Sequence, residues 1–147
     1  MENKTKTIED AIAIAADAHK GQKDKAGAAY ILHPLRLIMK METEAEMLAA
    51  VLHDVIEDTG WTIEKLREEG FPDEVLAAVE SVTKREGEDY DDFITRASQN
   101  PIGRRVKIGD LEDNLNTLRL SELQPKQLDN LAKCHRSWRR LSAKQNA

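Results

Sequence analysis

Cysteine and aromatic residues are scarce in this chain of 147 residues. The single cysteine, Cys134, excludes an internal disulfide and a zinc site built from several thiolates, so a metal site would need histidine and carboxylate ligands. Phe, Trp and Tyr make up only 4% of the residues. Long stretches rich in Ala, Leu, Glu and Lys favour helix over strand. We therefore expect an all-α fold.

A long apolar segment and an excess of positive charge are also missing. The longest uninterrupted apolar run, AIAIAA at 11–16, is far too short to cross a bilayer, and the N-terminal MENKTKTIED is polar. The net charge of -5 argues against nucleic acid as a partner, because binding to a phosphate backbone needs clustered Lys and Arg. We expect a cytoplasmic protein that binds neither membrane nor nucleic acid. The oligomeric state is left open.

Capping residues, prolines and glycines divide the chain into roughly seven or eight helices. No shift in composition marks a linker, so we expect residues 1–147 to form one domain. The segment GQKDKAGAAYILHP lacks helical periodicity and is predicted to be a loop of functional length. The helices are predicted at about 8–20, 34–41, 44–59, 63–69, 72–85, 90–100, 101–120 and from 125 onward.

The segment LAAVLHDVIEDT, residues 48–59, carries polar side chains on a helix that is otherwise built to be buried. On a continuous helix, four of them fall within an arc of about 140°: His53, Asp54, Glu57 and Asp58. Burying unpaired charge costs on the order of several kcal/mol. Something must compensate the acids, and a metal ion is one candidate.

Two further segments contain candidate ligands. His33 stands at the end of the predicted loop, where alone it would be only a polar residue near a helix start. In VKIGDLEDNLNTL, the residues Lys107, Asp110 and Asn114 follow an i, i+3, i+7 spacing and share one helix face. Alone, this face would be expected to be solvated.

Taken together, the three segments offer two neutral nitrogen ligands and two anionic oxygen ligands. These are His33, His53, Asp54 and Asp110. Such a set suits Mn, Fe, Zn or a similar divalent ion.

The motifs AHKGQ…YILHP, VLHDVIEDT and VKIGDLEDNLNTL occur in an order and spacing that resembles a known family. It is the hydrolase domain of the RelA/SpoT homologues, within the HD-domain metal-dependent phosphohydrolase superfamily of helical bundles. The matching region runs from about Ala18 to Leu118, and we expect no room after Leu120 for the family's synthetase domain. Stand-alone versions, the small alarmone hydrolases, have a similar length. The resemblance implies removal of the 3′-pyrophosphate from ppGpp and pppGpp, giving GDP or GTP and pyrophosphate.

The resemblance also implies roles for individual residues. The metal, usually Mn²⁺, would bind the four ligands named above, although another divalent ion would suit the same set. Glu57 and Asp58 match the acidic pair that helps to activate the attacking water. Asn114 matches a residue that contacts the anionic nucleotide, and Lys107 precedes the last ligand as in the family.

One departure from the family pattern is Asp24. The loop pattern AH-x-GQ-x-R-x-x-G has an Arg there that stacks on or near the guanine, and a carboxylate cannot reproduce that planar stacking. Lys20, Lys23 and Lys25 flank the position and could supply part of the lost positive charge.

Two alternatives therefore stay open. One is an HD phosphohydrolase acting on another phosphorylated nucleotide, such as an adenosine alarmone or a nucleotide monoester. The other is a non-catalytic regulatory module that binds a nucleotide, although retention of the Glu57 and Asp58 pair speaks against it.

Several other polar residues are predicted to be structural. His19 is expected to be a hydrogen-bonded core histidine, and Tyr30 is at least as well suited to packing as to lining a pocket. Glu112 and Asp113 are predicted to face water on the other side of their helix.

Overall fold

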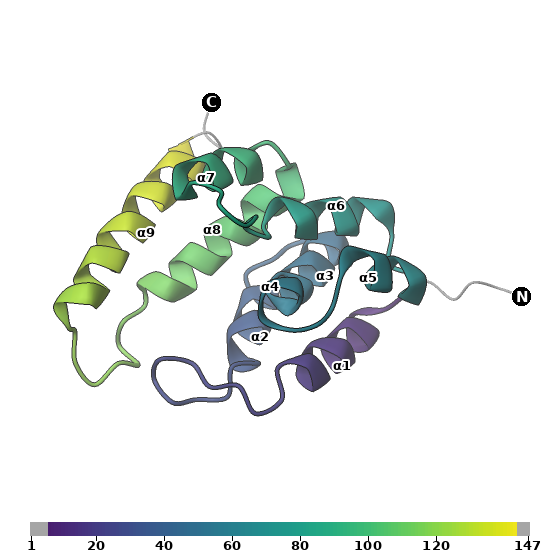
Figure 1. The fold of residues 1–147 in the computed structure, drawn as a ribbon, viewed down its shortest axis with the longest axis horizontal. Coiled ribbons are helices and arrows are strands. Elements are labelled where there is room, and N and C mark those ends of the chain that lie inside the picture. The colour runs from purple at the N-terminus through teal and green to yellow at the C-terminus, as the bar shows by residue number, and fades with distance from the viewer. Residues whose placement is uncertain (1–5, 144–147) are drawn as a thin grey trace, which may run out of the picture.

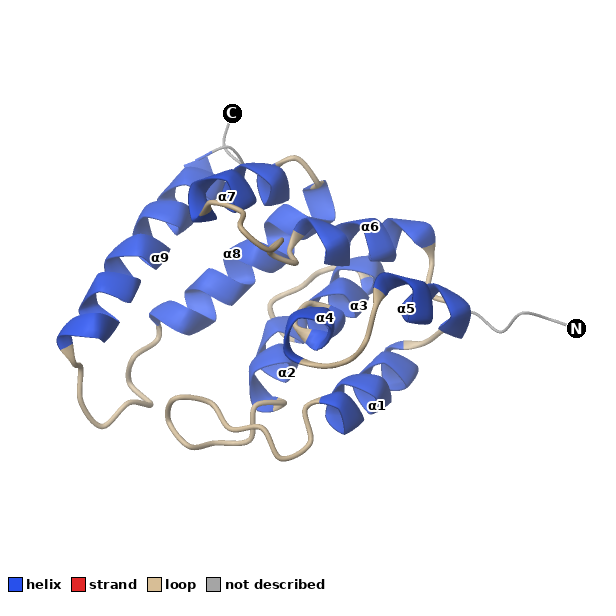
Figure 2. Ribbon diagram, viewed as in Figure 1, coloured by secondary structure: helices blue, strands red, loops and turns tan. Residues whose placement is uncertain are grey.

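Helices and connecting loops make up the whole of the computed structural model over the residues it describes, 6–143 (Figures 1 and 2). The expected all-α class is confirmed. The helices are α1 (Ile8–Ala18), α2 (Leu32–Ile38), α3 (Glu44–Leu52), α4 (Val55–Asp58), α5 (Ile63–Glu69), α6 (Asp73–Ser81), α7 (Tyr90–Ser98), α8 (Pro101–Leu115) and α9 (Pro125–Ala143). No helix in this range is both long and apolar enough to span a membrane.

Helix α3 lies at the centre of the main apolar core. The five residues 48–52 are all buried, and the helix contacts α1, α2, α6 and α8. A second, smaller apolar cluster lies between α7, α8 and α9 and includes Ile94, Leu111 and Leu141. Helix α8 contributes to both clusters, because Val106 belongs to the first and Leu111 to the second. It is therefore the element that joins the two halves of the bundle (Figure 1).

The predicted capping signals are present. Thr7 and Thr43 each form a complete capping box, with Asp10 and Glu46 as the reciprocal partners. These boxes satisfy backbone N–H groups that the first helical turn leaves unpaired. Gly70 ends α5 with φ of 106°, a left-handed conformation that glycine adopts without steric cost.

The continuous helix predicted over 44–59 is interrupted at His53 and Asp54. Helix α3 ends at Leu52 and the single turn α4 starts at Val55. The imidazole Nδ1 of His53 donates to the carbonyl of Ala50 at 2.6 Å. In an uninterrupted helix that carbonyl would accept the N–H of residue 54. The side chain therefore competes with the backbone, and the predicted 140° arc does not describe the segment.

Two helices also end earlier than predicted. Helix α6 ends at Ser81, about four residues short of the expected end. The Arg96 guanidinium accounts for this, since it donates to the carbonyls of Glu80 and Thr83, which a further turn of helix would use. Helix α8 ends at Leu115, about five residues short of the expected end, because Asn116 adopts an extended conformation.

The crossing of α6 and α8 depends on Gly103, and we predict that Gly103→Ala destabilises the fold. A Cβ there would lie 2.0 Å from Ser81 Oγ and 3.2 Å from Ser81 Cβ. Overpacking of this kind costs about 1–3 kcal/mol. The free energy of unfolding, measured by urea denaturation, should fall by that amount.

Two variants control this experiment. In a Ser81→Ala background most of the loss should disappear, because the nearest clashing atom is gone. For Gly109→Ala, on the same helix, the one close contact of the new Cβ is the flexible end of Met41 at 2.9 Å, and its other neighbours lie at ordinary contact distance, 3.7 Å or more. It should be neutral or stabilising, because Ala favours helix by up to about 1 kcal/mol. An equal loss with and without the Ser81 hydroxyl would contradict the steric explanation.

Candidate metal centre

The four predicted ligands come together from three elements. His33 lies in the first turn of α2, His53 and Asp54 occupy the break between α3 and α4, and Asp110 lies on α8. His33 Nε2 is 3.0 Å from Asp110 Oδ1, and His53 Nε2 is 2.8 Å from Asp54 Oδ2. The cross distances, His33 Nε2 to Asp54 Oδ2 and His53 Nε2 to Asp110 Oδ1, are both 3.7 Å.

Hydrogen bonds at the other nitrogen orient both imidazole rings. His33 Nδ1 donates to Asp113 Oδ2 at 2.6 Å, and His53 Nδ1 donates to the Ala50 carbonyl. Both Nε2 atoms therefore face the aspartates. Metal-binding histidines are commonly held in this way, with the second ring nitrogen on a carboxylate or a backbone carbonyl.

The donor set fits a divalent cation. His53 Nε2 is buried, and although it lies 2.8 Å from Asp54 Oδ2, it makes no hydrogen bond of suitable geometry within the described residues. Donor atoms around a first-row divalent ion at about 2.1 Å lie roughly 3.0–3.4 Å from one another, and the separations here bracket that range. Without Asp110, His33, His53 and Asp54 already present ligand atoms that all lie within 4.8 Å of one another. Asp110 Oδ1 lies 3.0 and 3.7 Å from the two Nε2 atoms. These residues could hold a metal ion.

The charges at this site favour a positive charge between the side chains, which either protons on the histidines or a metal cation can supply. Burial disfavours the imidazolium of His53, but the carboxylates of Asp54 and Asp110 together outweigh it and raise the pKa of His53 well above its usual value. Burial likewise opposes ionisation of Asp110, yet the Lys107 ammonium together with His33 and His53 holds the pKa of Asp110 well below its usual range. A metal ion would displace the proton on each Nε2 and leave the Nδ1 protons in their hydrogen bonds, because histidine ligands must be neutral.

Asp113 was predicted to face water, and that prediction is wrong. Its side chain is only 4% exposed, and its carboxylate accepts the hydrogen bond from His33. Arg36 binds the same carboxylate with two N–H groups, from Nε at 2.7 Å and from Nη2 at 2.9 Å. Burial opposes its ionisation, but the hydrogen bonds from His33 and Arg36 lower the pKa of Asp113 far below its usual value. The i, i+3 spacing from Asp110 was the signal that could have placed it on the ligand face.

Tyr30 contacts the centre directly. Its hydroxyl donates to Asp54 Oδ2, and its ring lies between those of His19 and His33, with centroids 4.9 and 5.7 Å away. Burial and the charge of Asp54 raise the pKa of Tyr30, so the hydroxyl keeps its proton. The prediction for His19 is confirmed, because it is 2% exposed and its Nδ1 lies 2.9 Å from Gln22 Oε1.

The two predicted catalytic acids occupy different positions. Glu57 lines the cavity beside the candidate metal ligands, and its Oε1 accepts the backbone N–H of Lys84. Asp58 is not among the lining residues, and its Oδ2 accepts a hydrogen bond of 3.4 Å from Gln22. Burial raises the pKa of both carboxyl groups.

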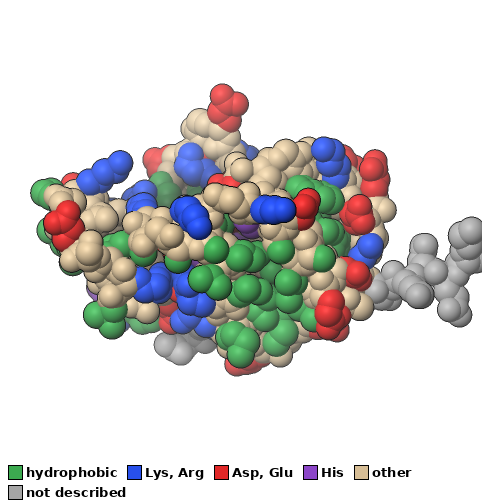
Figure 3. Space-filling view, turned by 90° about the horizontal axis from the view of Figure 1, so that it is seen from below, with side chains coloured by type: hydrophobic (Ala, Val, Ile, Leu, Met, Phe, Trp, Pro, Cys, Tyr) green, Lys and Arg blue, Asp and Glu red, His purple; other side chains and the backbone are tan. Residues whose placement is uncertain are grey.

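A cavity of about 500 Å³ opens over the ligands. Four of the five residues predicted to bind substrate line it: Lys23, Lys25, Lys107 and Asn114. Lys20 is exposed and lies outside the lining. Seen from below, basic side chains border the place where a histidine shows through the surface (Figure 3).

Lys107 and Asn114 also contact the ligand set. Lys107 Nζ donates to Asp110 Oδ2 at 2.7 Å, and Asn114 Nδ2 lies 3.4 Å from Asp110 Oδ1. The predicted sharing of one helix face by these three residues is confirmed. Both side chains therefore orient Asp110 as well as lining the cavity.

Asp24 has a structural role in the loop. Its Oδ1 accepts the backbone N–H groups of Ala26 and Ala28, both at 2.9 Å. These bonds shape the turn whose ends are joined by an isolated bridge between Lys23 and Ala29. The carboxylate is thus engaged by its own loop, and its position supplies no guanidinium to the cavity.

Comparison with known proteins identifies the family of the chain. The HD domain family matches residues 11–101, a range that includes His33, His53 and Asp54 and ends before Asp110. A guanosine-3′,5′-bis(diphosphate) 3′-pyrophosphohydrolase of Aquifex aeolicus is 34% identical over 123 residues, which cover 76% of this chain and 18% of the relative. The bifunctional (p)ppGpp synthase/hydrolase SpoT of Escherichia coli K12 is 32% identical over 133 residues, covering 80% of this chain and 19% of SpoT.

A probable GTP pyrophosphokinase of Mycobacterium leprae is 34% identical over 125 residues, covering 76% of this chain and 16% of that protein. The chain thus spans less than a fifth of the length of these relatives. A solved structure described as a metazoan ortholog of SpoT that hydrolyzes ppGpp superimposes with a TM-score of 0.75 and 22% identity, covering 94% of this chain and 86% of that one. Its fold is the same. By its sequence match and its helical bundle, the chain belongs to the HD domain family.

Proposed function

We propose that this chain is a metal-dependent phosphohydrolase that removes the 3′-pyrophosphate of ppGpp and pppGpp. The products are GDP or GTP and pyrophosphate. The observation that carries the proposal is the convergence of His33, His53, Asp54 and Asp110 at the floor of a cavity bordered by basic side chains. An anionic nucleotide suits that cavity, and such a substrate agrees with the cytoplasmic location expected from the sequence.

The relatives support hydrolysis over synthesis. Among the longer relatives some are named for hydrolysis and some for pyrophosphate transfer, and this chain matches less than a fifth of each. The fold match to the ppGpp-hydrolysing protein covers 86% of that chain. The helical bundle that the two chains share is the part of this chain to which we assign hydrolysis.

We assign the metal to the four converging ligands and propose Mn²⁺ as its identity, although the donor set suits other divalent ions. When bound, such an ion lowers the pKa of water and offsets negative charge on the reacting phosphate.

Glu57 is assigned as the general base. Its Oε1 is occupied by the Lys84 N–H, which leaves Oε2 to take a proton. Its raised pKa brings the carboxylate nearer to the value that favours proton transfer at neutral pH. The water oxygen bonds to the phosphorus attached to the ribose 3′-oxygen, and the bond from that phosphorus to the 3′-oxygen breaks. Glu57 receives one water proton, and the 3′-oxygen takes a proton from solvent. We assign Asp58 an indirect part, through the charge that it adds beside Glu57.

Lys23 and Lys25 are assigned to the phosphates of the substrate, because both line the cavity and neither is paired with an acid in the described range. Lys107 and Asn114 would contact substrate from α8 while they hold Asp110. Lys20 is assigned only a long-range contribution of positive charge.

A second candidate substrate class follows from Asp24. Because its carboxylate is tied into the loop, the base-stacking group implied by the family pattern is missing from that position. Another phosphorylated nucleotide, such as an adenosine alarmone or a nucleotide monoester, could then occupy the same centre.

Asp113 is assigned as a positioning residue for His33. It holds Nδ1 of the ring, and Arg36 holds Asp113 in turn. Removing such a support typically weakens metal binding by about 10- to 100-fold.

A substrate panel tests the proposed reaction. With Mn²⁺, the purified chain should release pyrophosphate from ppGpp, and a chelator should abolish turnover. His53→Ala should be inactive, whereas His135→Ala, an exposed histidine of α9 outside the cavity, should match the parent. Turnover of the adenosine alarmone or of 3′-monophosphates with ppGpp left intact would move the assignment to the second substrate class. If the chain binds nucleotides of the panel but hydrolyses none of them, the proposal that it is an enzyme is refuted.

Asp113→Asn tests the positioning role. The variant keeps the shape of the side chain and removes its charge, so Mn²⁺ affinity measured by titration calorimetry should fall about 10- to 100-fold. Glu112→Gln, one residue away with a side chain 40% exposed, is the matched control and should bind Mn²⁺ like the parent. Unchanged affinity in Asp113→Asn would remove the assignment.

Glu57→Gln tests the general base through the pH profile. A carboxyl group with a raised pKa loses its proton only at higher pH, so the parent rate at saturating Mn²⁺ should fall as the pH drops toward and through that value. This acid limb should lie above the ordinary glutamate value of about 4.3. The variant should be slower by about 10²- to 10⁴-fold and should lack this limb. Glu64→Gln, exposed on α5, is the control, and a Glu57→Gln enzyme with the parent's profile would contradict the assignment.

A further inference from the structure

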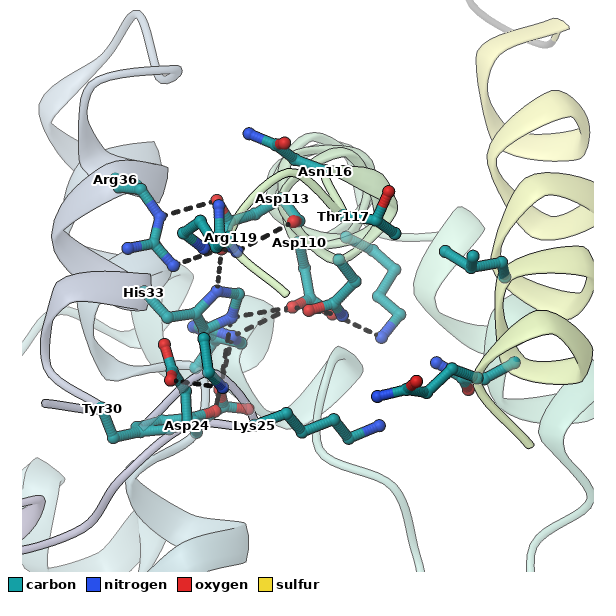
Figure 4. A pocket seen from close by; sticks show the side chains of 18 of the residues that line it. Asp24, Lys25, Tyr30, His33, Arg36, Asp110, Asp113, Asn116, Thr117 and Arg119 are labelled. Carbon is teal, nitrogen blue, oxygen red and sulfur yellow. Dashed lines mark hydrogen bonds and ion pairs between the residues drawn. The ribbon is translucent and has the colours of Figure 1, made fainter. Parts of the chain in front are cut away.

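A pair of arginines lies on the far side of His33 from the metal ligands. Arg36 of α2 and Arg119 of the segment after α8 both line the cavity, and both contact Asp113. Figure 4 shows His33 between this group and the loop residues Asp24 and Lys25. The cavity therefore extends well beyond the four ligands.

The two guanidinium groups carry more positive charge than their surroundings neutralise. Arg119 Nη2 lies 3.6 Å from Asp113 Oδ2, while the bidentate contact of Arg36 occupies the same carboxylate. Asp113 also accepts the His33 hydrogen bond. One carboxylate is thus shared by two guanidinium groups and one imidazole. The other carboxylate whose charge acts on Arg36 is Asp24. Its negative charge is offset by Lys23 and Lys25, which flank it in the loop and line the cavity.

Both arginines keep unused donors that water or a ligand can reach. Their side chains are 31% and 33% exposed. Within residues 6–143, Arg36 makes no hydrogen bond through Nη1, and Arg119 makes none through Nε or Nη1. A guanidinium presents its N–H groups in a planar fork that matches phosphate oxygens. The remaining donors are therefore suited to a phosphate that lies in the cavity.

The location separates this group from the reacting centre. His33 Nε2 faces the metal ligands and Nδ1 faces Asp113, so one imidazole ring and two hydrogen bonds lie between the ligand cluster and the guanidinium groups. A phosphate bound by the arginines would be near the metal without being bound to it.

We propose that Arg36 and Arg119 form a subsite for the 5′-diphosphate of the nucleotide, the phosphates that do not react. The inference rests on the proposed function, in which the 3′-pyrophosphate lies at the metal centre. It adds that this chain selects nucleotides phosphorylated on both sides of the ribose. It also gives Arg36 two roles. Its Nε and Nη2 hold Asp113, and the remaining Nη1 of the same guanidinium would bind the phosphate.

Titration of the metal-free protein with GDP and with guanosine tests the subsite without requiring turnover. The parent should bind GDP at least about tenfold more tightly than guanosine, because charged hydrogen bonds to the diphosphate are lost with the nucleoside. Arg119→Ala should remove most of that advantage while guanosine affinity stays the same. Arg36→Lys, which keeps the charge but lacks the fork, should remove part of it.

Arg105→Ala is the matched control. Arg105 lies on α8 outside the cavity and donates to the Lys40 carbonyl at 3.2 Å, so its loss should leave the GDP advantage unchanged. Equal binding of GDP and guanosine by the parent, or a full GDP advantage in Arg119→Ala, would overturn the subsite. Measuring ppGpp hydrolysis in parallel keeps the two proposals apart. An inactive parent that still loses its GDP advantage in Arg119→Ala would refute the reaction and leave the subsite standing.

Discussion

A single hydrogen bond, from the imidazole of His53 to the carbonyl of Ala50, determines the local geometry on which the centre depends. It takes the acceptor that would continue α3, so the helix breaks at this point. The same bond fixes the protonated nitrogen of the ring and leaves Nε2 facing inward. Because the backbone turns there, Asp54 points to the same place as His53 instead of about 100° away around a helix.

Most of the fold was predictable because its signals are local. Threonine caps at Thr7 and Thr43, the left-handed Gly70, and the prolines that open α8 and α9 act within a few residues of themselves. The early end of α6 was not predictable in this way. It depends on Arg96, which reaches the Glu80 carbonyl from another helix, and helical periodicity carries no information about such a contact.

The same distinction separates what was found at the site from what was missed. The four candidate ligands were chosen from residue types and motif order, and the structure brings these side chains close together. Asp113 was missed because its partner His33 is 80 residues away in the chain, so its burial has no local signal except its spacing from Asp110. Tyr30 was left undecided for a related reason, since only the folded chain shows its hydroxyl on Asp54.

The proposed ligand set joins residues that are far apart in sequence, with His33 and Asp110 separated by 77 positions. No such constellation persists in the unfolded chain, so a cation held there would bind only the native state. Metal availability would then contribute to folding equilibrium by mass action, by about 2.7 kcal/mol at a free concentration one hundred times the dissociation constant. The abundance of the intact protein in a cell would in that way follow its supply of the metal.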